Sequence, residues 1–132
     1  MTQREIKFRG WIKSKNKMEE VWQIDFVKKA NSDKLVANEV SIDDELLGVD
    51  TQVILMQFTG LKDKNGKEIY EGDIVINQWG IREEVNLEPI DVADYENGWA
   101  GFGWVLETHS LEDIKEKVEV IGNIYENKEL LK

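Results

Sequence analysis

The sequence predicts a mainly β protein, a β-rich α+β fold. An N-terminal β-hairpin precedes a small bent sheet or SH3-like barrel with one short helix. Three observations predict it: apolar side chains recur at every second position near the N-terminus, short runs of β-forming residues follow, and glycines separate these runs. The 132 residues, 41% of them hydrophobic, suffice for the core of one domain. We expect a single domain over residues 1–132, with a hairpin region at 1–37 and a barrel-like core at 53–127.

The N-terminal segment shows the clearest alternation in the chain. Charged and apolar residues alternate over residues 5–12, which places Ile6 and Phe8 on one face of a half-buried strand. Residues 14–17 supply a turn, and 18–26 are apolar at mixed spacing, so we expect a hairpin. Residues 28–37 are polar with no clear period, and within 27–52 both a helix and a loop stay open.

The central segment, residues 53–59, is the most apolar in the chain and predicts a strand buried on both faces. The Asn65-Gly66 pair predicts a tight turn that projects into water. Residues 71–73 predict a second turn, and the single helix start is at Ser110, with Asp113 closing a capping box. Further short strands are expected at residues 74–76, 82–87, 101–107 and 118–125.

Charge is unevenly distributed along the chain. The net charge of −10 argues against ordinary nucleic-acid binding, which depends on basic side chains neutralising phosphates. Residues 1–37 contain nine basic and five acidic residues, whereas 38–132 contain eight and 22. The stretch from Glu83 to Ile114 has no Lys or Arg and predicts an acidic interaction surface. Its residues are Glu83, Glu84, Glu88, Asp91, Asp94, Glu96 and Trp99, the last of which fits a core or an interface equally well.

No constellation of residues predicts catalysis. The chain has no cysteine, and its only histidine, His109, has no nucleophile at motif spacing. Residues 63–66 resemble part of a calcium loop, but this register puts Leu61 first and Gly72 twelfth, where carboxylate ligands are needed. Pairs such as Asp43 and Asp44 are typical of a solvated face. We therefore expect no catalytic residue, no cofactor and no metal, and an enzyme only if residues distant in sequence, such as Asp73, Glu107 and His109, converge.

Three blocks of sequence resemble the YopX family of phage and prophage proteins. They are Arg4-Glu5-Ile6-Lys7-Phe8-Arg9-Gly10-Trp11, the stretch from Met56 to Val75 that contains Asp63-Lys64-Asn65-Gly66, and the stretch from Val120 to Asn127. The resemblance implies a small domain encoded by a bacteriophage or prophage, with an N-terminal hairpin and a barrel-like C-terminal part. It implies no activity. The middle block is consistent with folding alone, because its glycines allow turns and its apolar residues fill a core.

Two functions are compatible with these observations. The first is a non-enzymatic protein-interaction module in the bacterial cytoplasm, whose acidic surface meets a host or phage protein. The alternative is a self-assembling structural protein, a homo-oligomer in which the basic N-terminal region docks on the acidic part of a neighbouring copy. We expect no membrane partner, because the sequence has no apolar run that could span a bilayer.

Overall fold

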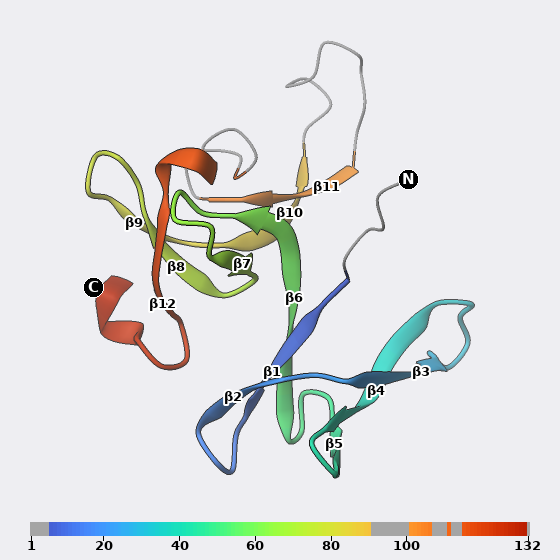
Figure 1. Cartoon of the computed structure of the whole chain (residues 1–132). Helices are drawn as coiled ribbons and strands as arrows, with labels where there is room; N and C mark the ends of the chain where they lie inside the picture. Colours follow the sequence, from blue (N-terminus) through green and yellow to red (C-terminus); the bar gives the residue numbers. More distant parts are fainter. Residues whose placement is uncertain (1–5, 91–100, 107–110, 112–114, 132) are drawn as a thin grey trace. The chain divides into compact units, whose positions relative to one another are not determined.

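The computed structural model describes residues 6–90, 101–106, 111 and 115–131. Its elements are almost all strands, which confirms the mainly β prediction (Figure 1). The chain divides into two compact units, Met1–Gln57 (unit 1) and Phe58–Lys132 (unit 2). Strand β6 (Val53–Lys62) runs across the boundary in sequence.

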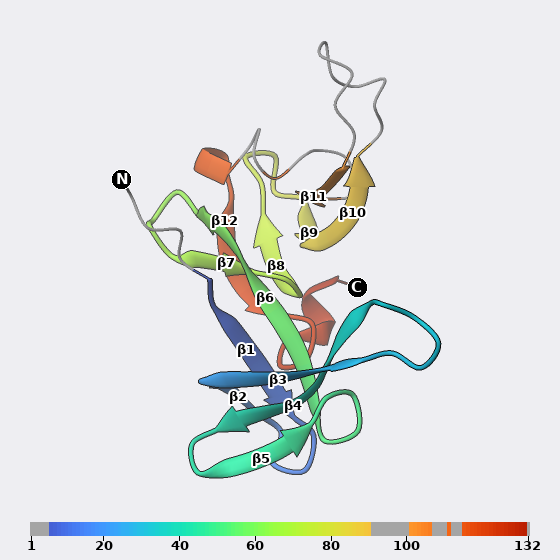
Figure 2. The same cartoon turned by 90° about the vertical axis from the view of Figure 1, so that its right-hand side faces the viewer.

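Unit 1 contains two small antiparallel sheets. The first pairs β1 (Phe8–Ile12) with β2 (Lys17–Glu20) on one side and with the beginning of β6 on the other, so the N-terminal hairpin is present. The second has the order β3 (Gln23–Lys28), β4 (Leu35–Ile42), β5 (Glu45–Gly48), which Figure 2 shows side by side. Residues 27–52 are therefore mainly strands rather than the helix or loop that the sequence left open.

The chain changes sheets at Val21 and Trp22. The backbone N–H of Val21 donates to the Phe8 carbonyl in the first sheet, and the N–H of Trp22 donates to the Ser41 carbonyl in the second. Such a corner lets one nearly continuous extended segment, β2 followed by β3, contribute to both layers. Between the layers lies a core of five buried side chains: Ile12, Val40, Ile42, Leu47 and Val53.

Unit 2 is a set of short strands around a core of its own. Phe58 and Lys62 of β6 pair with β7 (Glu68–Tyr70), and β8 (Asp73–Ile76) lies between β9 (Arg82–Glu84) and β12 (Glu119–Asn123). A third sheet pairs β10 (Asn86–Ile90) with β11 (Gly101–Val105). The described part of the unit also contains two 3-10 turns, η2 (Lys115–Lys117) and η3 (Lys128–Leu131). Its core comprises Ile69, Val75, Val85, Leu106, Leu111, Val118 and Val120.

The structure corrects the sequence prediction for the central strand. Strand β6 extends to Lys62 and is not buried on both faces, since Ile54 and Leu55 keep part of their surface exposed. The predicted helix start at Ser110 and Asp113 lies outside the described residues, although Leu111 is helical and buried. Among the described residues, no helix is long and apolar enough to cross a membrane.

Candidate functional site

The predicted acidic surface is only partly described. Glu83 is 3% exposed and lies two residues before the buried Val85 on the same face of the chain, so it does not contribute to an open surface. Glu84 is half-buried, and burial together with the charge of Glu71 raises its pKa. Glu88 has a described backbone in β10, while Asp91, Asp94, Glu96 and Trp99 lie outside the described residues. The acidic surface remains a prediction.

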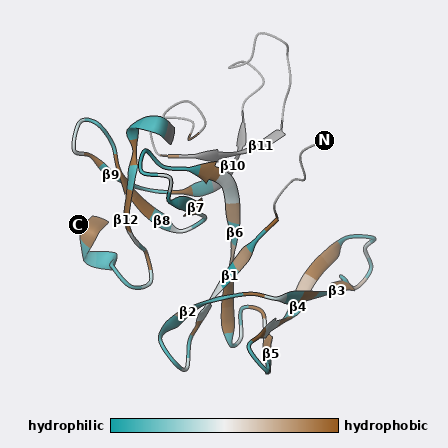
Figure 3. Cartoon of the chain, viewed as in Figure 1, coloured by the Kyte–Doolittle hydropathy of each residue, from teal (hydrophilic) through white to brown (hydrophobic). Residues whose placement is uncertain are grey.

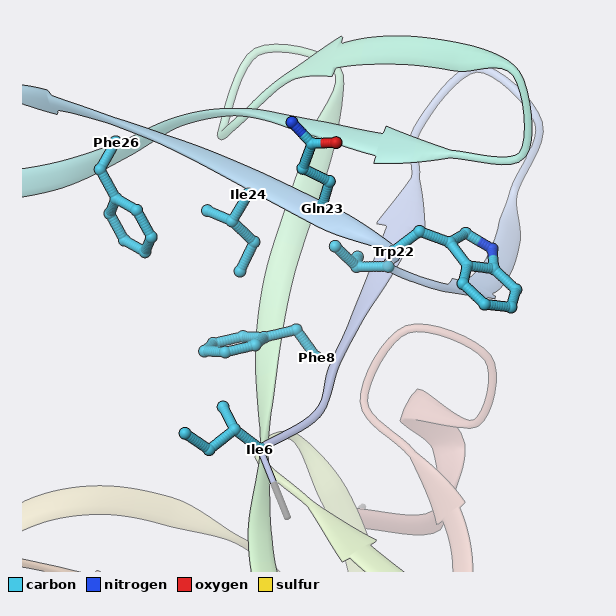
Figure 4. Close-up of a pocket in the computed structure, with 7 residues that line it drawn as sticks. Ile6, Phe8, Trp22, Gln23, Ile24 and Phe26 are labelled. Carbon is cyan, nitrogen blue, oxygen red and sulfur yellow. The ribbon is translucent and has the colours of Figure 1, made fainter. Parts of the chain in front are cut away.

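An apolar groove in unit 1 is the strongest candidate site (Figure 4). It has a volume of about 500 Å³, within the range of sites that hold ligands or several side chains. We call it the unit 1 groove. The residues that line it come from the N-terminal strand and from the corner and strand that follow: Ile6, Phe8, Val21, Trp22, Gln23, Ile24 and Phe26.

The groove is an outward continuation of the unit 1 core. On the β1 side, Ile12 and Gly10 are buried, Phe8 is half-buried and Ile6 is 72% exposed, although all four occupy alternate positions of one face. On β3, Ile24 is half-buried and packs against the core, whereas Phe26 is 56% exposed. The same apolar face therefore begins in the closed core and ends in open solvent.

The opposed walls of the groove are both apolar. Figure 4 shows Ile24 and Phe26 projecting from β3 toward the side on which Phe8 and Ile6 lie, with Trp22 at one end. Trp22 is 73% exposed, which is unusual because contact of so large an apolar side chain with water is unfavourable. Gln23 is the only polar residue of the lining, which contains no ionisable group. The groove can bury apolar groups, but its lining offers no general acid or base.

Strand β3 provides a second feature beside the groove, an open backbone edge. It stands at the end of the sheet order β3, β4, β5, and among the described residues it pairs with β4 alone. Because the N–H of Lys29 donates to the carbonyl of Lys34 in the same hairpin and donors alternate along a strand, the N–H groups of Phe26 and Lys28 point away from β4. Open edges of this kind can accept a further strand.

Charge around the groove differs from that of the whole protein. Residues 6–30, which form β1 to β3, contain seven basic and three acidic residues in a chain whose net charge is −10. Lys28 follows Phe26 by two positions on the groove face of β3, and Lys29 comes next. The groove therefore lies in the basic part of the chain.

The hydrophobic surface of unit 1 extends beyond the groove. Figure 3 shows hydrophobic residues on the outer part of the β3–β4 hairpin. Val27 pairs with Val36 on the face opposite Phe26, and Leu35 pairs with Lys28; all three apolar side chains are exposed. Unit 2 presents a smaller apolar tip, Trp79 and Ile81, on the turn between β8 and β9.

Three buried polar residues of unit 2 accept hydrogen bonds from the backbone of turns. Asp63 accepts hydrogen bonds from the backbone N–H groups of Asn65, Lys67 and Val120. Asn77 accepts hydrogen bonds from the N–H groups two and four residues further along the chain. Asn123 accepts them from the N–H groups two and three residues further along. Within the part of the chain that the structure describes, no cluster of three His, Asp or Glu residues could hold a metal ion.

Sequence reasoning identified the groove residues only in part. The alternation of Ile6 and Phe8 was visible, but the segment after the turn was assigned a mixed spacing. Trp22, Ile24 and Phe26 in fact recur at every second position, which is the signal of a strand face. What the sequence does not show is that the core stops short of covering this face.

Comparison with known proteins finds similarity but no activity. A family model described as "YopX protein" matches residues 7–132. The crystal structure of protein EF1440 from Enterococcus faecalis is similar, with 28% sequence identity, a TM-score of 0.58, and coverage of 98% of this chain and 100% of that one. No curated protein matches the chain.

Proposed function

Because the chain belongs to the YopX family, for which these comparisons give no activity, we propose from its geometry that it is a non-enzymatic protein-interaction module. Its binding surface is the unit 1 groove, and the occupant is an extended segment of a partner protein. The observation that carries this proposal is the apolar face of β1 and β3, which continues from the core into solvent with Trp22, Phe26 and Ile6 exposed. Covering such a face contributes about 25 cal/mol for each Å² of apolar surface removed from water.

The surroundings of the groove favour a polypeptide over a small metabolite. The lining has a single polar side chain to orient a small molecule, whereas the neighbouring edge of β3 offers backbone donors and acceptors that a peptide can use. The excess of basic residues in β1 to β3 favours a segment with acidic flanks, since complementary charge speeds encounter and selects the partner.

The proposal includes a biological setting. The YopX resemblance supports a bacteriophage or prophage origin, and the partner is then a host or phage protein in the bacterial cytoplasm. The similarity to a protein of Enterococcus faecalis is compatible with a bacterial setting.

Affinity capture with matched variants tests the proposal. We expect wild-type protein to retain a bacterial or phage protein from lysate, and Phe26→Ser to lose it, because Phe26 is a wall of the groove. Val27→Ser is the control, since Val27 is the next residue of β3 and is exposed on the opposite face. The retained protein should contact β3 by crosslinking. Equal retention by Phe26→Ser and wild type would exclude the groove as the binding surface.

Self-assembly is a second candidate, favoured by the charge difference between the units. Residues 1–57 contain nine basic and ten acidic residues, while residues 58–132 contain eight and seventeen. A neighbouring copy could therefore place its acidic unit 2 against the basic region 1–37. Light scattering at low and high salt tests this candidate, because charge-driven assembly weakens as salt screens it. A monomer at every salt concentration would exclude it.

A further inference from the structure

The open edge of β3 and the unit 1 groove are adjacent, and together they specify how a peptide would bind. The segment from Trp22 to Phe26 contributes to both. All of its side chains except that of Asp25 line the groove, and strand β3 has its second edge unpaired within the described residues. A ligand that lies along the edge places its backbone next to Phe26 and Lys28, whose N–H groups point away from β4. Its side chains then reach the groove without leaving the extended conformation.

The spacing of the groove residues matches an extended ligand. Trp22, Ile24 and Phe26 recur at every second position, so neighbouring side chains are roughly 7 Å apart along β3. An added strand has the same repeat, and its alternate side chains would enter the groove opposite these three residues. Phe8 and Ile6 on the other wall repeat with the same period.

The ends of the edge differ in charge. Beyond Phe26, the strand continues into Lys28 and Lys29, and among residues 6–30 basic side chains exceed acidic ones by seven to three. A ligand that carries carboxylates beyond its apolar positions would place them near these lysines. Apolar residues within the groove and acidic residues outside it therefore give the best complement.

We propose that the groove binds its partner by strand addition: an extended segment pairs with the free edge of β3, inserts apolar side chains at alternate positions into the groove, and carries acidic residues at the end that lies near Lys28 and Lys29. This proposal rests on the proposed function and specifies the class of ligand. The backbone hydrogen bonds supply affinity independent of sequence, and the groove selects the alternating apolar pattern.

Synthetic peptides test the strand addition directly. The probe is a short peptide with valine at alternate positions and two aspartates at each end, labelled with a fluorophore, so that either strand direction places one aspartate pair near Lys28 and Lys29. Its partner probe has the same side chains but N-methyl groups on the backbone nitrogens that would face β3. Fluorescence anisotropy should show binding of the first peptide to the wild-type protein and a loss of about tenfold or more for the second, since each lost backbone bond contributes roughly 1 kcal/mol.

A pair of protein variants tests whether the backbone of β3 itself takes part in binding. Lys28→Pro removes an outward-pointing N–H, whereas Lys28→Ala removes the same ammonium group and keeps the N–H. We expect Lys28→Pro to bind the valine peptide about tenfold more weakly than Lys28→Ala. Circular dichroism and thermal unfolding establish that both variants are folded. If Lys28→Pro does not fold, the N-methylated peptide still decides the question with the wild-type protein.

Each outcome separates strand addition from groove binding. Equal affinity of the wild-type protein for the two peptides, or of the two Lys28 variants for the valine peptide, would overturn strand addition and leave the proposed groove function intact. Failure of the wild-type protein to bind the acidic-ended peptide would also overturn it, while the capture experiment with Phe26→Ser would still test the groove itself. A dimer of the protein alone that dissociates in Lys28→Pro but not in Lys28→Ala would assign the edge to a second copy, contrary to the proposal.

Discussion

Gly10 shows how a single missing side chain closes the unit 1 core. It lies in the middle of β1, and a Cβ atom placed there would collide with the Val53 side chain and come within 3.2 Å of Ile42 Cδ1. These neighbours come from the two sheets that enclose the core. The reason for glycine at this position is therefore close packing, since its backbone does not have a positive φ.

The first prediction concerns Gly10→Ala, which should lower the free energy of unfolding by about 1–3 kcal/mol because it overpacks a closed core. Adding Val53→Ala removes the methyl groups that collide, so the double variant should lose less stability than the sum of the two single losses. Urea denaturation of the three variants measures this difference. Strictly additive losses would contradict the close-packing explanation.

Glu84 is a residue whose charge opposes folding. Its half-buried carboxylate is disfavoured first by desolvation and second by the negative charge of Glu71, and its pKa in the folded state is raised. A raised pKa means that the folded state binds a proton more tightly than the unfolded chain. The associated stability is present below the unfolded pKa and is lost as pH rises through the folded pKa.

The second prediction follows from this sign. Glu84→Gln should increase the free energy of unfolding at neutral pH by about a few tenths of a kcal/mol, because a neutral side chain replaces a disfavoured carboxylate in a partly screened position. The gain should vanish when the pH falls below the ordinary pKa of a glutamate. Glu116→Gln, on an exposed turn, is the control for removal of one negative charge. A gain of the same size in the control would point to net charge instead.

At the scale of elements, Asp63 attaches a turn to a distant strand. Its Oδ1 accepts hydrogen bonds from the N–H groups of Asn65 and Lys67, and its Oδ2 accepts one from Val120 in β12. The N–H of Lys64 also donates to the carbonyl of Val118. The turn at Asn65 and Gly66 is exposed at its tip, as predicted, but one side of it is bound to β12.

The third prediction is that Asp63→Ala lowers the free energy of unfolding by about 3 kcal/mol, because it leaves buried N–H groups without an acceptor. Asp63→Asn should lose about half as much, since one oxygen remains. Burial raises the pKa of Asp63, but the three N–H groups outweigh burial and the pKa is lowered. The stability from its charge is therefore present above the unfolded pKa and is lost as pH falls through the folded one.

Urea titrations from about pH 6 to about pH 3 measure this loss in the wild-type protein and in Asp63→Asn. The wild type should lose more stability over the acidic range than the variant, because the variant has no charge to lose at this position. Parallel pH profiles would show that the carboxylate of Asp63 does not carry the contribution.

The elements also show what sequence could and could not predict. Turns were predicted well where glycine supplies a positive φ, as at Gly66 and Gly72, because that requirement is local. The sequence did not predict strand β4, because the outer residues of this strand, Leu35 and Val36, are exposed on opposite faces of a hairpin. The charge of Glu83 predicts a position on the surface. Glu83 is buried because it lies on the same face of the chain as the buried Val85. Burial depends on which strands pair, and that information is not local.

At the scale of the whole molecule, the two units have separate sets of core residues. Ile42 belongs to the core of unit 1 and Ile69 to that of unit 2, and both are buried. A unit with a core of its own can open without complete loss of structure elsewhere. The groove depends on unit 1, whose stability therefore governs binding.

The last prediction is that Ile42→Ala and Ile69→Ala act on different units. Each variant should lose about 2–5 kcal/mol in its own core, because the cavity is only partly refilled. Hydrogen exchange measured by mass spectrometry should then show faster exchange mainly within residues 8–57 for Ile42→Ala and mainly within 58–131 for Ile69→Ala. Ile42→Ala should also weaken binding of the valine peptide more than Ile69→Ala, because the groove walls are an extension of the unit 1 core. Equal acceleration of exchange throughout the chain in both variants would instead show that the two units unfold as one cooperative body.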